Sequence, residues 1–235
     1  TALVEEGSKP RGDEVLQLLD RSRKVAFRLL SESRYDVGER LALLLLFAYG
    51  VQEELDGGDN REFDPQKALE TAKAFATGGD RKAIFGFFRG LEILTPQWAQ
   101  CLEAKPLDVP WSEEHAALAK YFLLRYWLQA ASDYDLVGRV KFAIASCLVI
   151  RASGGELQQT AQLYSKEIEN DIDNVDALLD GAYTESCFCD AALLDLLLTL
   201  QKNDLKHIRQ LQYYTTGRFM ELDLDARRNL ELTET

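Results

Sequence analysis

The sequence predicts an all-α fold, a multi-helix bundle of about nine or ten helices around a central hydrophobic helix. Apolar residues recur at helical spacing along most of the chain, and no segment alternates polar and apolar residues between hairpin turns. The run from Leu41 to Val51 contains no charged residue, although polar residues flank it on both sides. Because residues 41–47 are apolar all round, neighbouring helices must cover this helix on every side.

Two helices open the chain. The first, residues 13–31, places its apolar residues near one face, at Leu16, Leu19, Ala26, Leu29 and Leu30. Asp36 precedes Glu39 by three residues, which is the spacing of a capping box, where each side chain accepts a hydrogen bond from the other residue's backbone N–H. The second helix therefore begins after Asp36, and we expect it to end at residues 57–58, both glycine.

Prolines and glycines delimit the helices that follow. Asp64 before Pro65 is a strong helix start, and this helix is expected to close at the two glycines of residues 78–79. Asp80 begins the next helix. A short helix over residues 95–102 then begins at a threonine followed by a proline.

Further helices are predicted in the second half of the chain. Ser112, followed by two glutamates, begins a long helix that contains YFLLRYWL. The next helix contains VKFAIASCLVI and ends at two glycines. The expected ranges are 112–131, 134–153, 156–170, 175–181 and 187–202.

Prolines at positions 106 and 110 mark the clearest linker in the sequence. Beyond residue 202 too little apolar surface remains to fold alone, so a peripheral helix and tail are expected there. The predicted parts are an N-terminal tail (1–12), an N-terminal helical subdomain (13–104), the linker (105–111), a C-terminal helical subdomain (112–202) and the peripheral helix and tail (203–235).

The charge balance restricts the partners. Against 27 lysines and arginines stand 39 aspartates and glutamates, a formal net charge of −12. This charge repels phosphate backbones and anionic lipids, so we expect no nucleic acid and no membrane as partner, and a basic peptide or protein surface is favoured. The apolar run of residues 41–51 spans roughly 16 Å as a helix, about half the hydrocarbon thickness of a bilayer, and is therefore read as a core helix.

Cysteines and known motifs give little sign of chemistry. The four cysteines, at positions 101, 147, 187 and 189, are too few and too irregular for a disulfide scaffold, which favours reduced thiols in the cytoplasm. The sequence has no glycine-rich phosphate loop, nucleophile elbow or zinc-protease helix, and its two histidines, His115 and His207, are far apart. The acidic cluster of residues 167–176 lacks the glycine of a calcium loop and is read as a solvated surface. No metal site is expected.

Five residues are candidates for substrate contacts or buried polar contacts. In YFLLRYW, Arg125 and Tyr126 lie among aromatic residues that can line a pocket for a carboxylate, an adenine ring or a peptide; the alternative is core packing with Arg125 at the margin. Arg40 is expected to form a buried ion pair with Glu167 or Glu169, or else to contact a substrate. No catalytic role is assigned to any of them.

Four stretches, taken in order, carry a resemblance to a known family: RSRKVAFRLLSESRYDVGERLALLLLFAYGVQEELDGGD, EEHAALAKYFLLRYWL, VKFAIASCLVIRA and TAQLYSKEIENDIDNVDALLD. They resemble the C-terminal half of the flagellin lysine-N-methylase family, over roughly residues 14–200. The resemblance implies methylation of surface lysines of flagellin with S-adenosylmethionine, and an N-terminal region whose cysteines bind an iron–sulfur cluster. This chain has no such cysteine set, and it reads Glu169-Asn170 where the family tends to read Glu-His.

The resemblance implies that the chain is a helical scaffold and substrate-recognition region, inactive alone, with the cluster-binding catalytic part elsewhere. No cofactor is then expected within this chain, and the expected partner is flagellin or another lysine-bearing protein. An alternative is a non-catalytic helical protein-interaction domain. A third interpretation, an effector-binding domain of a regulator, is disfavoured because no basic recognition helix is present.

Overall fold

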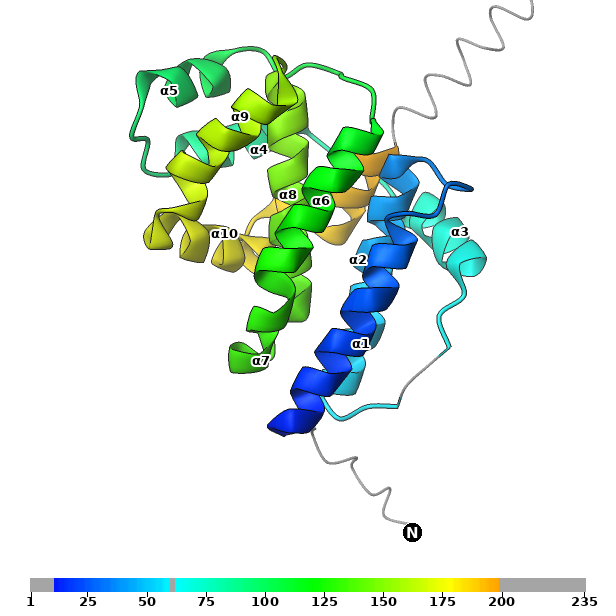
Figure 1. Cartoon of the computed structure of the whole chain (residues 1–235). Helices are drawn as coiled ribbons and strands as arrows, with labels where there is room; N and C mark the ends of the chain where they lie inside the picture. The colour runs from blue at the N-terminus through cyan, green and yellow to red at the C-terminus, as the bar shows by residue number, and fades with distance from the viewer. Residues whose placement is uncertain (1–10, 60–61, 199–235) are drawn as a thin grey trace, which may run out of the picture. The chain divides into compact units, whose positions relative to one another are not determined.

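A computed structural model describes residues 11–59 and 62–198 (Figure 1), and these residues contain helices and connecting segments with no strand. They belong to one compact unit. The prediction of an all-α bundle is therefore confirmed. The helices are α1 (Asp13–Leu29), α2 (Val37–Leu55), α3 (Pro65–Phe75), α4 (Arg81–Arg89), α5 (Pro96–Glu103), α6 (Glu113–Tyr126), α7 (Ala130–Asp133), α8 (Leu136–Ser153), α9 (Leu157–Tyr164) and α10 (Ile172–Thr184), and a further helical stretch covers residues 190–198.

Two helices, α2 and α8, pack against each other at the centre. The first half of α2 is deeply buried, since residues 41–45 expose 0–1% of their surface. Every residue of α8 from Leu136 to Ala152 is buried, because α2, α4, α6, α9 and α10 all pack against it. The sequence predicts α2 alone as the central helix. In the structure the later turns of α2 reach the surface at Tyr49 and Gly50.

The helix starts follow the local signals. Asp36 and Glu39 form the predicted capping box: the Glu39 N–H donates to Asp36 Oδ1 at 2.8 Å, and the Asp36 N–H donates to Glu39 Oε2 at 3.2 Å. Asp64 likewise accepts hydrogen bonds from the first turn of α3. One prediction about a face is wrong, because Leu16 of α1 is 48% exposed while the other four apolar residues of that face are buried.

Contacts with the 190–198 helix displace one predicted helix end. Helix α3 ends at Phe75, short of the glycines at residues 78–79, because the N–H of Thr77 donates to Ala191 O at 3.0 Å. The Gly79 N–H donates to Asp195 Oδ2 at 3.1 Å. The same helix approaches the start of α2 so closely that a Cβ on Gly38 would overlap the carbonyl oxygen of Leu197.

No helix among the described residues is long and apolar enough to cross a membrane. His207 and the predicted helix and tail of residues 203–235 lie outside the described residues, as does the end of the helix predicted over 187–202. The division of the rest into two helical subdomains stays a prediction.

Candidate functional site

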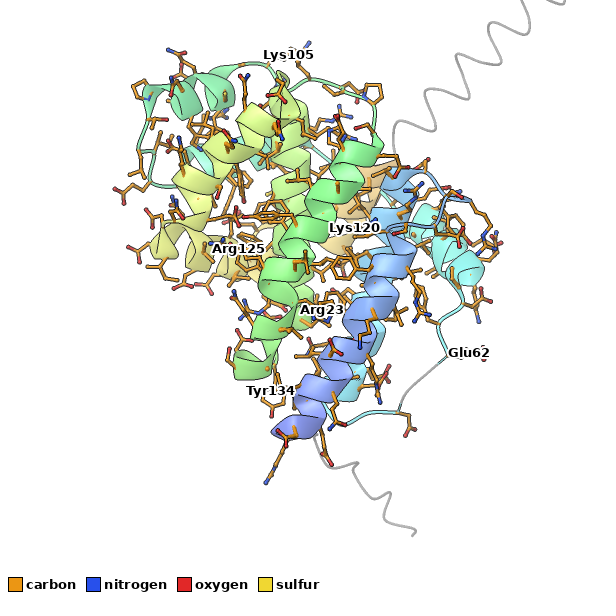
Figure 2. All side chains as sticks on the ribbon, in the orientation of Figure 1. Arg23, Glu62, Lys105, Lys120, Arg125 and Tyr134 are labelled. Atoms are coloured by element: carbon orange, nitrogen blue, oxygen red, sulfur yellow. The ribbon has the colours of Figure 1, made fainter. Side chains whose placement is uncertain are left out.

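Three of the five predicted site residues meet where α6 lies beside the junction of α9 and α10. Arg125 projects from α6 on the side of α10 (Figure 2). Its Nε lies 3.1 Å from Glu169 Oε1, and the Tyr126 hydroxyl donates to the same oxygen at 3.0 Å. A residue that the sequence did not single out as a candidate, Tyr121, donates to Glu169 Oε2 at 3.0 Å. We call Tyr121, Arg125, Tyr126 and Glu169 the Glu169 cluster.

A π-helical turn brings Glu169 to this position. Residues 165–169 form the turn, and the Asn170 N–H closes it on Ser165 O at 3.1 Å. The last three residues of this turn, Glu167, Ile168 and Glu169, are all buried. Two carboxylates therefore point inward from one short segment.

Both oxygens of the Glu169 carboxylate accept hydrogen bonds from side chains of the protein. Burial raises the pKa of Tyr126, and the neighbouring negative charge of Glu169 raises it further, so the phenol stays a neutral donor. Burial and Glu169 act on the pKa of Tyr121 in the same direction. With two phenols and one guanidinium on one carboxylate, the cluster contains no free base or nucleophile and acts as a polar clamp between α6 and the α9–α10 junction.

Glu167, the fourth predicted residue, faces a different neighbour. Its side chain is fully buried, and its Oε2 accepts a hydrogen bond from the Leu94 N–H at 2.8 Å. Asn174 adds a second connection, since its Nδ2 donates to Glu167 O and to Glu92 O, each at 2.9 Å. These bonds fix the segment between α4 and α5 against α10.

Arg40, the fifth predicted residue, pairs with neither Glu167 nor Glu169, so that prediction is wrong. Its guanidinium binds the Glu113 carboxylate with both terminal nitrogens, at 2.9 Å each. It also donates from Nε to Tyr35 O at 2.8 Å and from Nη1 to Leu30 O at 3.3 Å. The turn between α1 and α2 supplies these carbonyls, so Arg40 fastens that turn to the start of α6 instead of reaching the α9–α10 junction.

A pocket of about 480 Å³ opens between α1, α2 and the segment before α3. Sequence reasoning missed it because a cavity has no residue pattern of its own. One signal was available, a glycine at position 50 inside the apolar run of residues 41–51. The pocket is lined by Leu18, Arg21, Ser22, Val25, Arg28, Phe47, Gly50, Val51, Glu53, Glu54, Glu62 and Phe63.

The floor of this pocket is apolar and its rim is charged. The rings of Phe47 and Phe63 pack edge to face, with centroids 5.3 Å apart, and close one side. The hydroxyl of Ser22 donates to Leu19 O at 3.1 Å, so its proton is engaged within α1. A Cβ built on Gly50 would meet no atom within 4 Å, which shows open space at this point of the wall.

Comparisons with known proteins give short matches only. The chain is 43% identical over 61 residues to the DNA mismatch repair protein MutS of Lachnoclostridium phytofermentans, which covers 24% of this chain and 6% of that protein. It is 49% identical over 43 residues to MutS of Clostridium novyi and 44% identical over 43 residues to MutS of Bacillus cytotoxicus, in each case 18% of this chain and 5% of the relative. No family model and no solved structure matches.

These matches correct the resemblance drawn from the sequence. None of these relatives is a flagellin lysine-N-methylase, and the similarity found is to a different protein, so the identification is wrong. The physical reason lies in composition. Buried helices draw on the same few residues, above all leucine, alanine and aromatic residues, so leucine-rich stretches of unrelated bundles look alike. Only that resemblance implied S-adenosylmethionine and the iron–sulfur cluster, so the reason to expect them is removed.

Proposed function

We propose that this unit is a non-catalytic helical protein-interaction domain, whose pocket between α1 and α2 receives the apolar face of an amphipathic helix from a partner protein. The observation that carries the proposal is the combination of an apolar floor with a charged rim. Sites for small molecules hold the ligand through a small number of polar groups placed within an apolar lining. The only hydroxyl of this lining, that of Ser22, already donates within α1.

The shape of the pocket favours a helix as the occupant. Its α1 wall runs from Leu18 through Ser22 and Val25 to Arg28, positions that share one face of a helix. These residues span about 15 Å at 1.5 Å per residue, close to three turns of a helix lying alongside. Amphipathic helices bind in such grooves through side chains spaced three and four residues apart.

The charges favour basic residues in that helix. The rim carries three carboxylates, Glu53, Glu54 and Glu62, and two guanidiniums, Arg21 and Arg28, a net charge of −1. Arg21 and Glu54 pair with each other at 2.6 Å. Glu62 stands at the outer edge of the unit (Figure 2). Together with the net charge of −12, this rim attracts lysines and arginines that flank an apolar stripe. A lysine-bearing partner protein meets this requirement.

The test uses a fluorescent 18-residue helix of leucine and lysine with one apolar face, and a scrambled peptide of the same composition. We expect the wild-type chain to bind the amphipathic peptide more tightly than the scrambled one. Replacing Gly50 by leucine fills the pocket and is expected to weaken binding at least tenfold. The matched control is Gly86→Leu, at an exposed glycine of α4 where a Cβ also has room.

Equal binding of both peptides would show that charge alone is responsible. Unchanged binding by Gly50→Leu would show that the pocket is not the docking site. Either result removes the proposal.

The name of the similar proteins makes DNA the competing partner. We propose that the chain on its own binds no nucleic acid, because a net charge of −12 opposes a phosphate backbone. Polarisation of a labelled duplex with one mismatch, at low salt, tests this, and saturable binding would contradict it.

A cytoplasmic location is part of the same proposal, and it is supported by the four cysteines, which are all free thiols.

A further inference from the structure

Arg151, in the last turn of α8, is a buried cation whose donors have no acceptor in the protein. It is 1% exposed, and its Nε, Nη1 and Nη2 lack hydrogen-bond partners. The other buried cations of the described residues, Arg40, Arg139 and Lys141, each pair with a carboxylate. A guanidinium carries five N–H donors, and burying it without acceptors or a counter-charge is strongly unfavourable.

An aromatic ring and an ion pair surround Arg151. Its Cζ lies 4.0 Å from the ring centroid of Trp111, so an aromatic face covers one side of the guanidinium. Arg81 is close enough to oppose the charge of Arg151, while Asp108 supports it, and burial is the largest cause that lowers the pKa of Arg151 to about 10. Arg81 binds Asp108 through Nη2 at 2.6 Å, but its Nε is buried without a partner.

The proline-containing linker, residues 105–111, lies over this end of α8. The Leu107 N–H donates to Ala152 O at 2.7 Å, and the Leu107 side chain fills the space beside Gly154. Asp108 fastens the linker a second time through Arg81. Four of the seven linker residues, at positions 105, 107, 108 and 110, are exposed.

We propose that Arg151, together with Arg81, binds a small oxyanion beneath this linker, either free phosphate or a carboxylate group. The unpartnered atoms of both side chains are donors only, and the planar fork of a guanidinium fits two oxygens of one phosphate or carboxylate. Water satisfies the donors but adds no negative charge, and the nearby Asp108 is already paired with Arg81. An oxyanion satisfies both. The site shares no residue with the pocket between α1 and α2, so it stands apart from the proposed function.

The experiment measures the melting temperature of the full chain against the concentration of inorganic phosphate, acetate and chloride at one ionic strength. We expect a rise of about 5 to 10 °C at a phosphate concentration a hundredfold above its Kd. A larger response to acetate than to phosphate would assign the site to carboxylates. Chloride corrects for screening.

Three variants separate specific binding from the general stabilising effect of phosphate on proteins. Arg151→Met is expected to abolish the response to the oxyanion without lowering the melting temperature in its absence, since it removes an uncompensated charge. Arg151→Lys keeps the charge but not the fork, and is expected to reduce the response. The control, Lys120→Met, removes a half-buried cation of α6 (Figure 2) and is expected to respond as the wild type does.

Binding to the wild-type chain is also measured directly, by equilibrium dialysis with labelled phosphate and labelled acetate. This measurement decides the question if Arg151→Met does not fold. The proposal is wrong if neither ion binds at tens of millimolar, or if Arg151→Met and the wild type respond equally; water would then be the partner of Arg151.

Discussion

Replacing Glu169 by leucine tests whether the Glu169 cluster holds α6 to the α9–α10 junction. The leucine side chain is similar in size, but it leaves two phenols and one guanidinium without their acceptor. Tyr126 is 5% exposed, so its hydroxyl loses a charge-assisted hydrogen bond and is left without a partner, at a cost of about 2 to 3 kcal/mol. Tyr121 and the Arg125 side chain are 38% and 43% exposed and can turn to water, which costs about 0.5 kcal/mol each.

The sum is a loss of about 3 to 4 kcal/mol in the free energy of unfolding. Tyr126→Phe removes one hydrogen bond and leaves Glu169 two partners, so a loss of about 1 to 2 kcal/mol is expected. Urea unfolding followed by circular dichroism measures both variants, and equal slopes against urea show that the unfolded states are comparable. A loss below about 1 kcal/mol for Glu169→Leu would refute the role of the cluster as a clamp.

Three further predictions concern the core, the pocket and acid stability. Leu44→Asp buries an unpaired charge at a position 0% exposed and is expected to abolish cooperative thermal unfolding, whereas Leu16→Asp, at a 48% exposed position, is expected to leave the melting temperature almost unchanged. Gly50→Ala should raise the free energy of unfolding by about 0.5 to 1 kcal/mol in urea titrations, since alanine is the better helix former and meets no atom there; a loss would show that the wall is closed. Burial, with the positive Arg151 nearby, lowers the pKa of His115 from 6.5 to about 4, so its contribution to stability is present above pH 6.5 and is lost as the pH falls toward 4. His115→Gln should flatten this part of the curve of melting temperature against pH, and an unchanged curve would contradict it.

The sequence predicts those features that depend on neighbouring residues. Asp36 with Glu39, and Asp64 with Pro65, start helices as predicted, because capping involves only residues within one turn. Arg125 and Tyr126 lie where α6 passes Glu169, but nothing local connects residues more than forty positions apart.

The features that the sequence misses depend on tertiary partners. Lys141 lies inside α8 because Asp190 and the Ala182 carbonyl are there to receive it, at 2.9 and 3.1 Å. Its charge would otherwise suggest an exposed face, so the pattern understates how central α8 is. Arg40 pairs with Glu113, 73 residues away, and the two carboxylates predicted for it are turned elsewhere by the π-helical turn. The packing of the helices decides which of several carboxylates an arginine pairs with.

The close approach of Gly38 to the Leu197 carbonyl has a consequence for biosynthesis. Helix α2 is the second helix to be synthesised, whereas Leu197 lies almost at the end of the described unit. A ribosome must therefore finish this whole stretch before the two can meet. Until then the start of α2 lacks this neighbour, and apolar surface that stays exposed on a partly synthesised chain is prone to aggregation. Any fragment that stops short of residue 190 would remain in that incomplete state permanently.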